Sequence, residues 1–177
     1  VHLLTQNSYI MFRNKDYTII KYEFTTEDVK FLQMAAQLSE ENVDSGGGPF
    51  GAVIVREGEI LSTGANRVTV NNDPTAHAEV MAIREACRKQ KTFNLRGATI
   101  YSSCEPCPMC LSALYWAGVD KIIYGNTQED ADAIDFSDKF LYDELSKPQE
   151  ERKLKCIHMP NDFTIRAFQK WAEKTDK

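Results

Sequence analysis

The feature that most constrains this sequence is a run of three cysteines, Cys104, Cys107 and Cys110, downstream of the triplet His77-Ala78-Glu79. Zinc accepts imidazole nitrogen and thiolate sulfur, and a catalytic zinc site uses three protein ligands and a water molecule. Two cysteines three residues apart face the same side of the first turn of a helix. We therefore predict that His77, Cys107 and Cys110 bind Zn2+.

The third cysteine, Cys104, would close the site as a fourth ligand if it faced the metal. Pro106 disfavours helical geometry at Glu105, so Cys104 should lie on the incoming strand and point away from the ligands. Pro108 suits the first position of a helix that Cys107 caps. One coordination position is therefore expected to stay open for water.

Glu79 is the expected general acid and base. Residues two apart in a helix point to different faces, so His77 and Glu79 share a site only if the helix begins near His77. A structural zinc site or a redox dithiol is the alternative interpretation of the cysteines. The first leaves Glu79 without a role, and the second leaves His77 without one.

Strands and helices alternate through the middle of the chain, which favours an α/β layered domain. Thr25 is suited to cap a helix, with acidic residues in its first turn. The expected strands are 51–55, 60–65, 98–101 and 121–124, and the expected helices include one ending near Lys89, 107–118 and 137–145.

The net charge of −5 argues against a nucleic-acid partner, because such proteins neutralise phosphates with a basic surface. An odd number of cysteines, five, does not fit a secreted disulfide framework. No apolar run is long enough to span a membrane, and residues 1–24 lack a secretory signal pattern. A cytoplasmic location is expected.

The combination of H-x-E with P-C-x-x-C is typical of zinc deaminases. Beyond these motifs, the chain closely resembles the guanine deaminase family of the cytidine-deaminase-like superfamily. The stretches that carry the resemblance are Gly47–Val55, Asn72–Glu79, Cys104–Cys110, Tyr115–Ala117, Lys147–Arg152 and Phe168–Trp171. The resemblance covers residues 25–177 and leaves 1–24 as an extension of unknown role.

The resemblance implies a three-layer α-β-α domain with a mixed five-stranded sheet, and a homodimer. In this family the C-terminal segment crosses to the partner subunit, so residues 145–177 are a candidate swapped arm. An ordinary surface loop is the alternative for the charged connector at 145–155. In this family an aromatic residue also follows the tail helix, whereas Trp171 is the last aromatic here.

The implied reaction is hydrolysis of guanine to xanthine and ammonia, with zinc-bound hydroxide attacking C2 and Glu79 carrying protons. Correspondence with the family places Phe50, Asn66, Trp116 and Asp138 near the purine. Each also fits a plain structural role, as a core aromatic, a turn residue or a helix-capping acid. The alternatives are a deaminase of guanosine, cytosine or a tRNA adenosine, or a zinc-binding module without catalysis.

Overall fold

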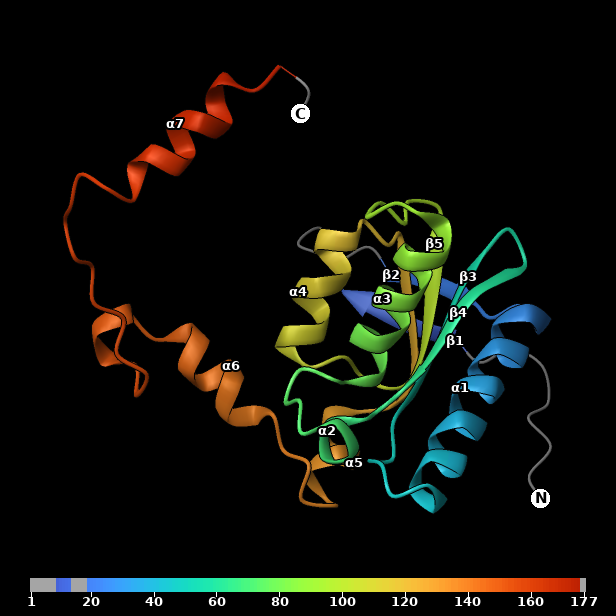
Figure 1. Ribbon diagram of the computed structural model, residues 1–177. Helices are drawn as coiled ribbons and strands as arrows, with labels where there is room; N and C mark the ends of the chain where they lie inside the picture. Colours follow the sequence, from blue (N-terminus) through green and yellow to red (C-terminus); the bar gives the residue numbers. More distant parts are fainter. Residues whose placement is uncertain (1–8, 14–18, 176–177) are drawn as a thin grey trace. The chain divides into compact units, whose positions relative to one another are not determined.

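The computed structural model describes residues 9–13 and 19–175, and the chain divides into two compact units at 1–139 and 140–177 (Figure 1). Strands β1 (Tyr9–Arg13) and β2 (Ile19–Glu23) form an antiparallel two-stranded sheet. Parts of the expected N-terminal extension, residues 1–8 and 14–18, lie outside the described residues, as do 176–177 at the C-terminal end.

The first unit is built on a mixed sheet with the strand order β4-β3-β5-β6. Strand β3 (Gly51–Arg56) runs antiparallel to β4 (Glu59–Ala65) and to β5 (Ala98–Cys104). Strand β5 runs parallel to β6 (Lys121–Asn126), so the carboxyl ends of these two strands meet at one edge of the sheet. The mixed α/β architecture is as the sequence predicted.

Helices cover both faces of this sheet, which gives the expected three layers (Figure 1). Alternate side chains of a strand point to opposite faces. Val53 and Val55 accordingly pack with Phe31 of α1 (Thr26–Asp44), whereas Ala52 and Ile54 belong to a second core. That second core includes residues of α3 (Ala78–Gln90) and α4 (Pro108–Ala117).

The expected fifth strand is absent among the described residues, and the sheet has four strands. The segment after β6 forms a helix instead, α5 (Gln128–Asp132). Thr127 accepts a hydrogen bond from the backbone N–H of Asp130, whose carboxylate accepts one from the backbone of Thr127. This capping box starts a helix directly after the strand.

Strand β4 and helix α3 approach each other unusually closely. A side chain at Gly64 would place its Cβ 2.2 Å from the carbonyl oxygen of Ala78 and 2.6 Å from the backbone nitrogen of Ala82. Glycine is therefore required at this position, and it sets the spacing between the strand and the beginning of α3. A loop that contains the short helix α2 (Val68–Asn71) joins the two elements.

Helix α1 begins where the sequence predicted, with Thr25 as its cap in a capping box with Asp28. Asp28 is buried and also accepts hydrogen bonds from the hydroxyls of Tyr101 at 2.8 Å and Tyr22 at 3.2 Å. Burial raises the pKa of Asp28, but the hydrogen bonds from Thr25 and the tyrosines outweigh it and hold the pKa below its ordinary value. The carboxylate thus joins α1 to β2 and β5.

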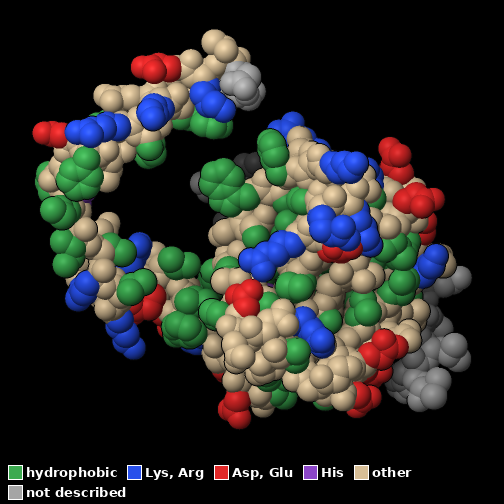
Figure 2. Space-filling view, viewed as in Figure 1, with side chains coloured by type: hydrophobic (Ala, Val, Ile, Leu, Met, Phe, Trp, Pro, Cys, Tyr) green, Lys and Arg blue, Asp and Glu red, His purple; other side chains and the backbone are tan. Residues whose placement is uncertain are grey.

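The second unit contains most of α6 (Lys139–Ser146), a single 3₁₀ turn (Gln149–Glu151) and α7 (Ile165–Glu173). None of these elements has a buried residue, and Figure 2 shows hydrophobic side chains gathered along this part of the chain. Ile165, Phe168 and Trp171 recur at helical spacing along α7. No helix in the described parts of the chain is long and apolar enough to cross a membrane.

Candidate metal centre and pocket

The predicted ligands lie where two helices begin. His77 is the N-cap of α3, and Cys107 is the N-cap of α4, with Pro108 at its first position as predicted. The His77 backbone is extended, with φ −68° and ψ 155°, so its side chain does not follow the helical phase of Glu79. This geometry lets both side chains reach one site although they are only two residues apart.

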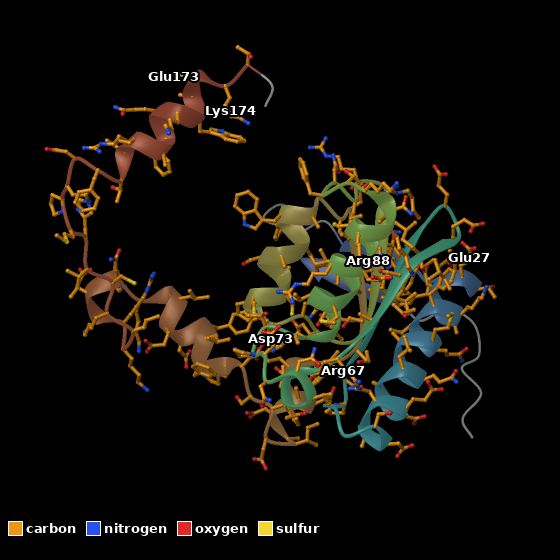
Figure 3. The ribbon with its side chains drawn as sticks, viewed as in Figure 1. Glu27, Arg67, Asp73, Arg88, Glu173 and Lys174 are labelled. Carbon is orange, nitrogen blue, oxygen red and sulfur yellow. The ribbon has the colours of Figure 1, made fainter. Side chains whose placement is uncertain are left out.

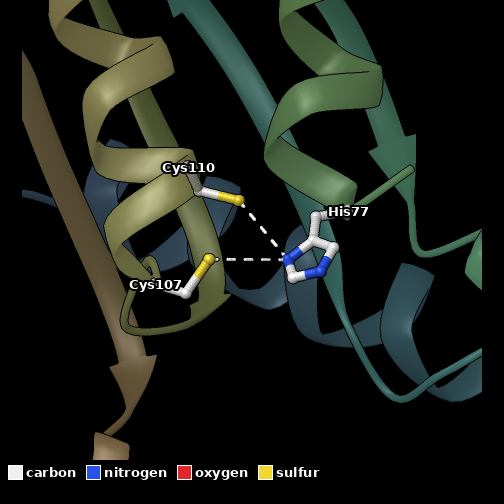
Figure 4. Close-up of side chains that lie close together, drawn as sticks. All are labelled: His77, Cys107 and Cys110. Atoms are coloured by element: carbon white, nitrogen blue, oxygen red, sulfur yellow. Dashed lines mark hydrogen bonds between the residues drawn. The ribbon is translucent and has the colours of Figure 1, made fainter. Parts of the chain in front are cut away.

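The three side chains converge as a metal site requires. The Nδ1 atom of His77 lies 3.6 Å from the Sγ of Cys107 and 3.5 Å from the Sγ of Cys110 (Figure 4). A tetrahedral zinc with bonds of about 2.3 Å to sulfur and about 2.0 Å to nitrogen places such atoms about 3.5 Å apart. The donor set and its spacing therefore fit zinc.

The two thiols influence each other's protonation. A hydrogen bond with Cys110 and the neighbouring His77 lower the pKa of Cys107 to about 4, although burial opposes this shift. The hydrogen bond with Cys107 and burial raise the pKa of Cys110. Since two adjacent thiolates repel, both sulfurs become anionic only beside a cation, and the positive ends of the helices favour this state.

Cys104 does not belong to this group, in agreement with the sequence analysis. It is the last residue of β5, and its thiol donates to the carbonyl oxygen of Thr127 at 3.6 Å. Burial, with the nearby charge of Glu79, raises the pKa of Cys104 to about 11. Its exclusion from the group rests on position, because its sulfur is not among the three ligand atoms that converge.

Glu79 lies in the first turn of α3, with only 6% of its surface exposed. One carboxylate oxygen accepts a hydrogen bond from the hydroxyl of Ser102 on β5, at 3.1 Å. Burial raises the pKa of Glu79, so this carboxyl group holds a proton more readily than an exposed one. Glu79, His77 and Cys107 line the same cavity, as required of a group that exchanges protons near the metal site.

The cavity has a volume of about 400 Å³, which is within the usual range for small-molecule pockets. Three of the four predicted substrate residues line it: Phe50, Asn66 and Asp138. The ring of Phe50 packs edge-on against Phe136, with centroids 5.2 Å apart. Gln128 donates from its side-chain amide to Asp138 at 2.7 Å, which orients the carboxylate.

Trp116, the fourth predicted substrate residue, is not brought to this cavity. Its side chain is 89% exposed on α4, whereas Cys110, Leu114 and Ala117 of the same helix are buried. An α-helix completes one turn in 3.6 residues, so Trp116, six positions after Cys110, projects from a different face of α4. Trp116 therefore lies on the protein surface.

Sequence reasoning missed Ser102 and several residues of the cavity wall. Ser102 supports Glu79 without lining the cavity, carries no motif and lies on a strand. Glu105 is part of the cysteine motif and was recognisable from it, whereas Gln128 and Phe136 have no local signal. The other lining residues that were not predicted are Gly46, Gly47, Gly48, Val68, Thr69 and Ala131.

Comparison with known proteins agrees with this geometry. The zinc-binding region of cytidine and deoxycytidylate deaminases matches residues 25–126. A guanine deaminase of Bacillus subtilis is 46% identical over 148 residues, which cover 83% of this chain and 95% of that protein. A tRNA-specific adenosine deaminase of Aquifex aeolicus is 45% identical over 94 residues, covering 53% of this chain and 62% of the relative.

Among solved structures, the X-ray structure of the Bacillus subtilis guanine deaminase matches with a TM-score of 0.82 and 44% identity. The match covers 87% of this chain and 98% of that one, well beyond the zinc-binding region. A cluster of His77, Cys107 and Cys110 at a cavity that a buried carboxylate also lines is what this kinship predicts. The chain belongs to the zinc-dependent cytidine and deoxycytidylate deaminase family, and within it is similar to guanine deaminase over most of its length.

Proposed function

We propose that this protein catalyses the hydrolytic deamination of guanine to xanthine and ammonia. The observation that carries the proposal is the 46% identity to a guanine deaminase, which extends over 148 residues and is not confined to the zinc motifs. The cavity beside the metal site supports it, because aromatic rings and convergent polar groups suit a planar base.

His77, Cys107 and Cys110 hold the zinc in this proposal. When bound, the metal supplies a hydrolytic nucleophile at neutral pH by lowering the pKa of water from about 15.7 to about 7. Glu79 accepts a proton from the attacking water and delivers it to a ring nitrogen. It then accepts the proton of the hydroxyl group newly bonded to C2 and delivers that proton to the departing amine, which leaves as ammonia. Ser102 keeps the carboxylate in place through its hydrogen bond to one oxygen.

Phe50, Asn66 and Asp138 orient the purine in this proposal. Phe50 offers an apolar ring to a base face, and Asn66 offers an amide to its edge. Asp138 accepts the imidazole N–H of the base, and Gln128 fixes its orientation. A nucleoside lacks that N–H because the sugar replaces it, so this contact favours a free base.

A homodimer is part of the same proposal, with residues 145–177 of one subunit covering the other. A nine-residue helix with no buried residue, such as α7, is marginal by itself in water. Its exposed Ile165, Phe168 and Trp171 supply an apolar face for a partner, and Trp116 on α4 adds to the apolar surface available for packing.

The test is an ammonia-release screen over guanine, guanosine, cytosine, adenine and a tRNA anticodon stem-loop. We expect guanine to have the highest kcat/KM, and preference for any other substrate contradicts the assignment.

Glu79→Gln should retain zinc and lower kcat by about 10²–10⁴-fold. Glu85→Gln, an exposed carboxylate on the same helix paired with Arg88, is the matched control and should keep full activity. Near-normal activity of Glu79→Gln would exclude its role as proton shuttle.

A further inference from the structure

One buried side chain outside the cavity connects two parts of its wall. Asn42 lies in the last turn of α1 with 4% of its surface exposed. Its Nδ2 donates to the carbonyl oxygens of Gly48 and Asn66, each at 2.7 Å. Both acceptor residues line the cavity, whereas Asn42 itself does not.

The orientation of the Asn42 amide is fixed by these partners. Carbonyl oxygens accept hydrogen bonds and a guanidinium donates them, so the NH₂ group must face the two carbonyls. The oxygen accepts from Nη1 of Arg67 at 3.2 Å. Figure 3 shows Arg67 on the loop that follows β4. Asn42 thereby joins α1, the glycine loop 46–48 and the end of β4.

The glycine loop 46–48 packs tightly against Asn42 and Asn66. A Cβ at Gly47 would lie 2.3 Å from Nδ2 of Asn42 and 2.6 Å from the carbonyl oxygen of Asn66. A Cβ at Gly48 would lie 3.1 Å from the side chain of Asn66. The backbone N–H of Gly47 also donates to the carbonyl oxygen of Asn42 at 2.9 Å. The loop is thus in direct contact with both asparagines.

The side chain of Asn66 is oriented as a consequence. The backbone N–H of Val68 donates to its Oδ1 at 3.3 Å, and since an N–H cannot accept, this atom is the oxygen. The oxygen thus already has one partner, and the NH₂ group of Asn66 can donate two hydrogen bonds. We therefore expect Asn66 to meet a base as a donor. This holds only while the backbone of Asn66 stays where Asn42 holds it.

We propose that Asn42 is a positioning residue for substrate binding, which holds Gly48 and Asn66 so that the Asn66 amide donates to an acceptor on the edge of the purine. The proposal rests on the proposed function. It assigns to Asn42 an effect on KM that acts through Asn66, without contact between Asn42 and substrate. Because zinc and Glu79 are held by other elements, kcat and metal content should depend little on Asn42.

The test compares Asn42→Asp and Asn42→Ala with the wild type. Asp keeps the volume and the Arg67 contact but lacks both donors, so it remains informative if the Ala variant unfolds. We expect KM for guanine to rise at least about tenfold, kcat to change less than about threefold, and zinc content to stay the same. Ser62→Ala is the matched control, because Ser62 is buried and donates to Ala82 at 2.7 Å away from the cavity. It should lower the melting temperature without raising KM.

A double-mutant cycle separates positioning from general destabilisation. In an Asn66→Ala background, Asn42→Asp should raise KM less than about twofold further. A KM within twofold of the wild type for the single variant, or an equal KM effect in both backgrounds, overturns the proposal. A wild-type enzyme that releases no ammonia from guanine overturns the proposed function instead, so the two failures are distinguishable.

Discussion

The two units of this chain differ in how far their large apolar residues are exposed. In the first unit, Phe31, Ile54 and Leu114 are at most 2% exposed, and they pack in two cores on the two faces of the sheet. In the second unit, Ile157 and Phe168 are 89% and 75% exposed. Both units use amphipathic helices, but only the first buries their apolar faces within itself.

This contrast indicates different sources of stability. The first unit is stabilised by its own cores, at about 25 cal/mol for each Å² of apolar surface removed from water. The second unit has no described residue that is buried, so its apolar face contributes mainly when a partner covers it. Activity should therefore depend on the first unit directly and on the second unit through assembly.

The largest difference in zinc binding and ammonia release is expected between substitutions of two cysteines, one in each unit. Cys110→Ala removes a fully buried side chain that we propose as a zinc ligand, and it should abolish zinc binding and ammonia release. Cys156→Ala changes an exposed cysteine of the second unit and should leave both unchanged. Metal analysis of the purified variants, with activity measured alongside, decides this. Stoichiometric zinc in Cys110→Ala would show that the site is built differently.

An intermediate effect is expected when one apolar side chain is truncated in each unit. Leu114→Ala should lower the free energy of unfolding by about 2–5 kcal/mol, because it leaves a cavity in the core. Phe168→Ala should change the free energy of unfolding of the isolated subunit by less than about 0.5 kcal/mol, because its ring is exposed there. Urea denaturation measures both values.

The same Phe168→Ala variant should weaken self-association, which analytical ultracentrifugation over a range of concentrations measures. A wild-type protein that stays monomeric at all concentrations would remove the proposed role of the C-terminal segment. A Phe168→Ala variant that unfolds like Leu114→Ala would show that the two units share one core.

The smallest effect concerns acid stability. Since the folded pKa of Asp28 is below its ordinary value of 3.8, the carboxylate stabilises the fold above about pH 4. That contribution is lost as the pH falls through the folded pKa, so Asp28→Asn should flatten the dependence of stability on pH between about 4 and 2. Glu144→Gln, in a partly exposed pair with Lys147, should change this dependence less. Urea midpoints at several pH values distinguish the two, and equal slopes would contradict the burial argument.

Features decided within a few residues were predictable from the sequence. Thr25 with Asp28 depends on capping, and Cys107 with Pro108 depends on the geometry of proline, and both act locally. The helix start at His77 was predicted differently, from the requirement that His77 and Glu79 share one site, and His77 makes no side-chain capping hydrogen bond. The convergence of His77, Cys107 and Cys110 was predictable because their residue types and spacing serve few other purposes. The position of Cys104 at the end of β5, outside this cluster, was predictable from Pro106.

Features decided by distant contacts were not predictable in this way. Ser102 supports Glu79 from 23 positions away, and Gln128 orients Asp138 across ten. Their partners are set by how the strands and helices meet, which no local pattern contains. The strand count was not predictable from local patterns either, because the five-stranded sheet came from the resemblance alone, whereas four strands pair in the sheet of the described residues.

Gly64 fixes the distance between β4 and α3 because it has no side chain. A larger residue at position 64 would collide with the backbone of α3 and displace the helix. His77 and Glu79 would both move, because they lie at the beginning of that helix. Metal binding and proton transfer could not be adjusted separately by such a change. A change of substrate base therefore requires less rearrangement by substitutions in the loops around Asn66 and Phe136 than by substitutions where β4 contacts α3.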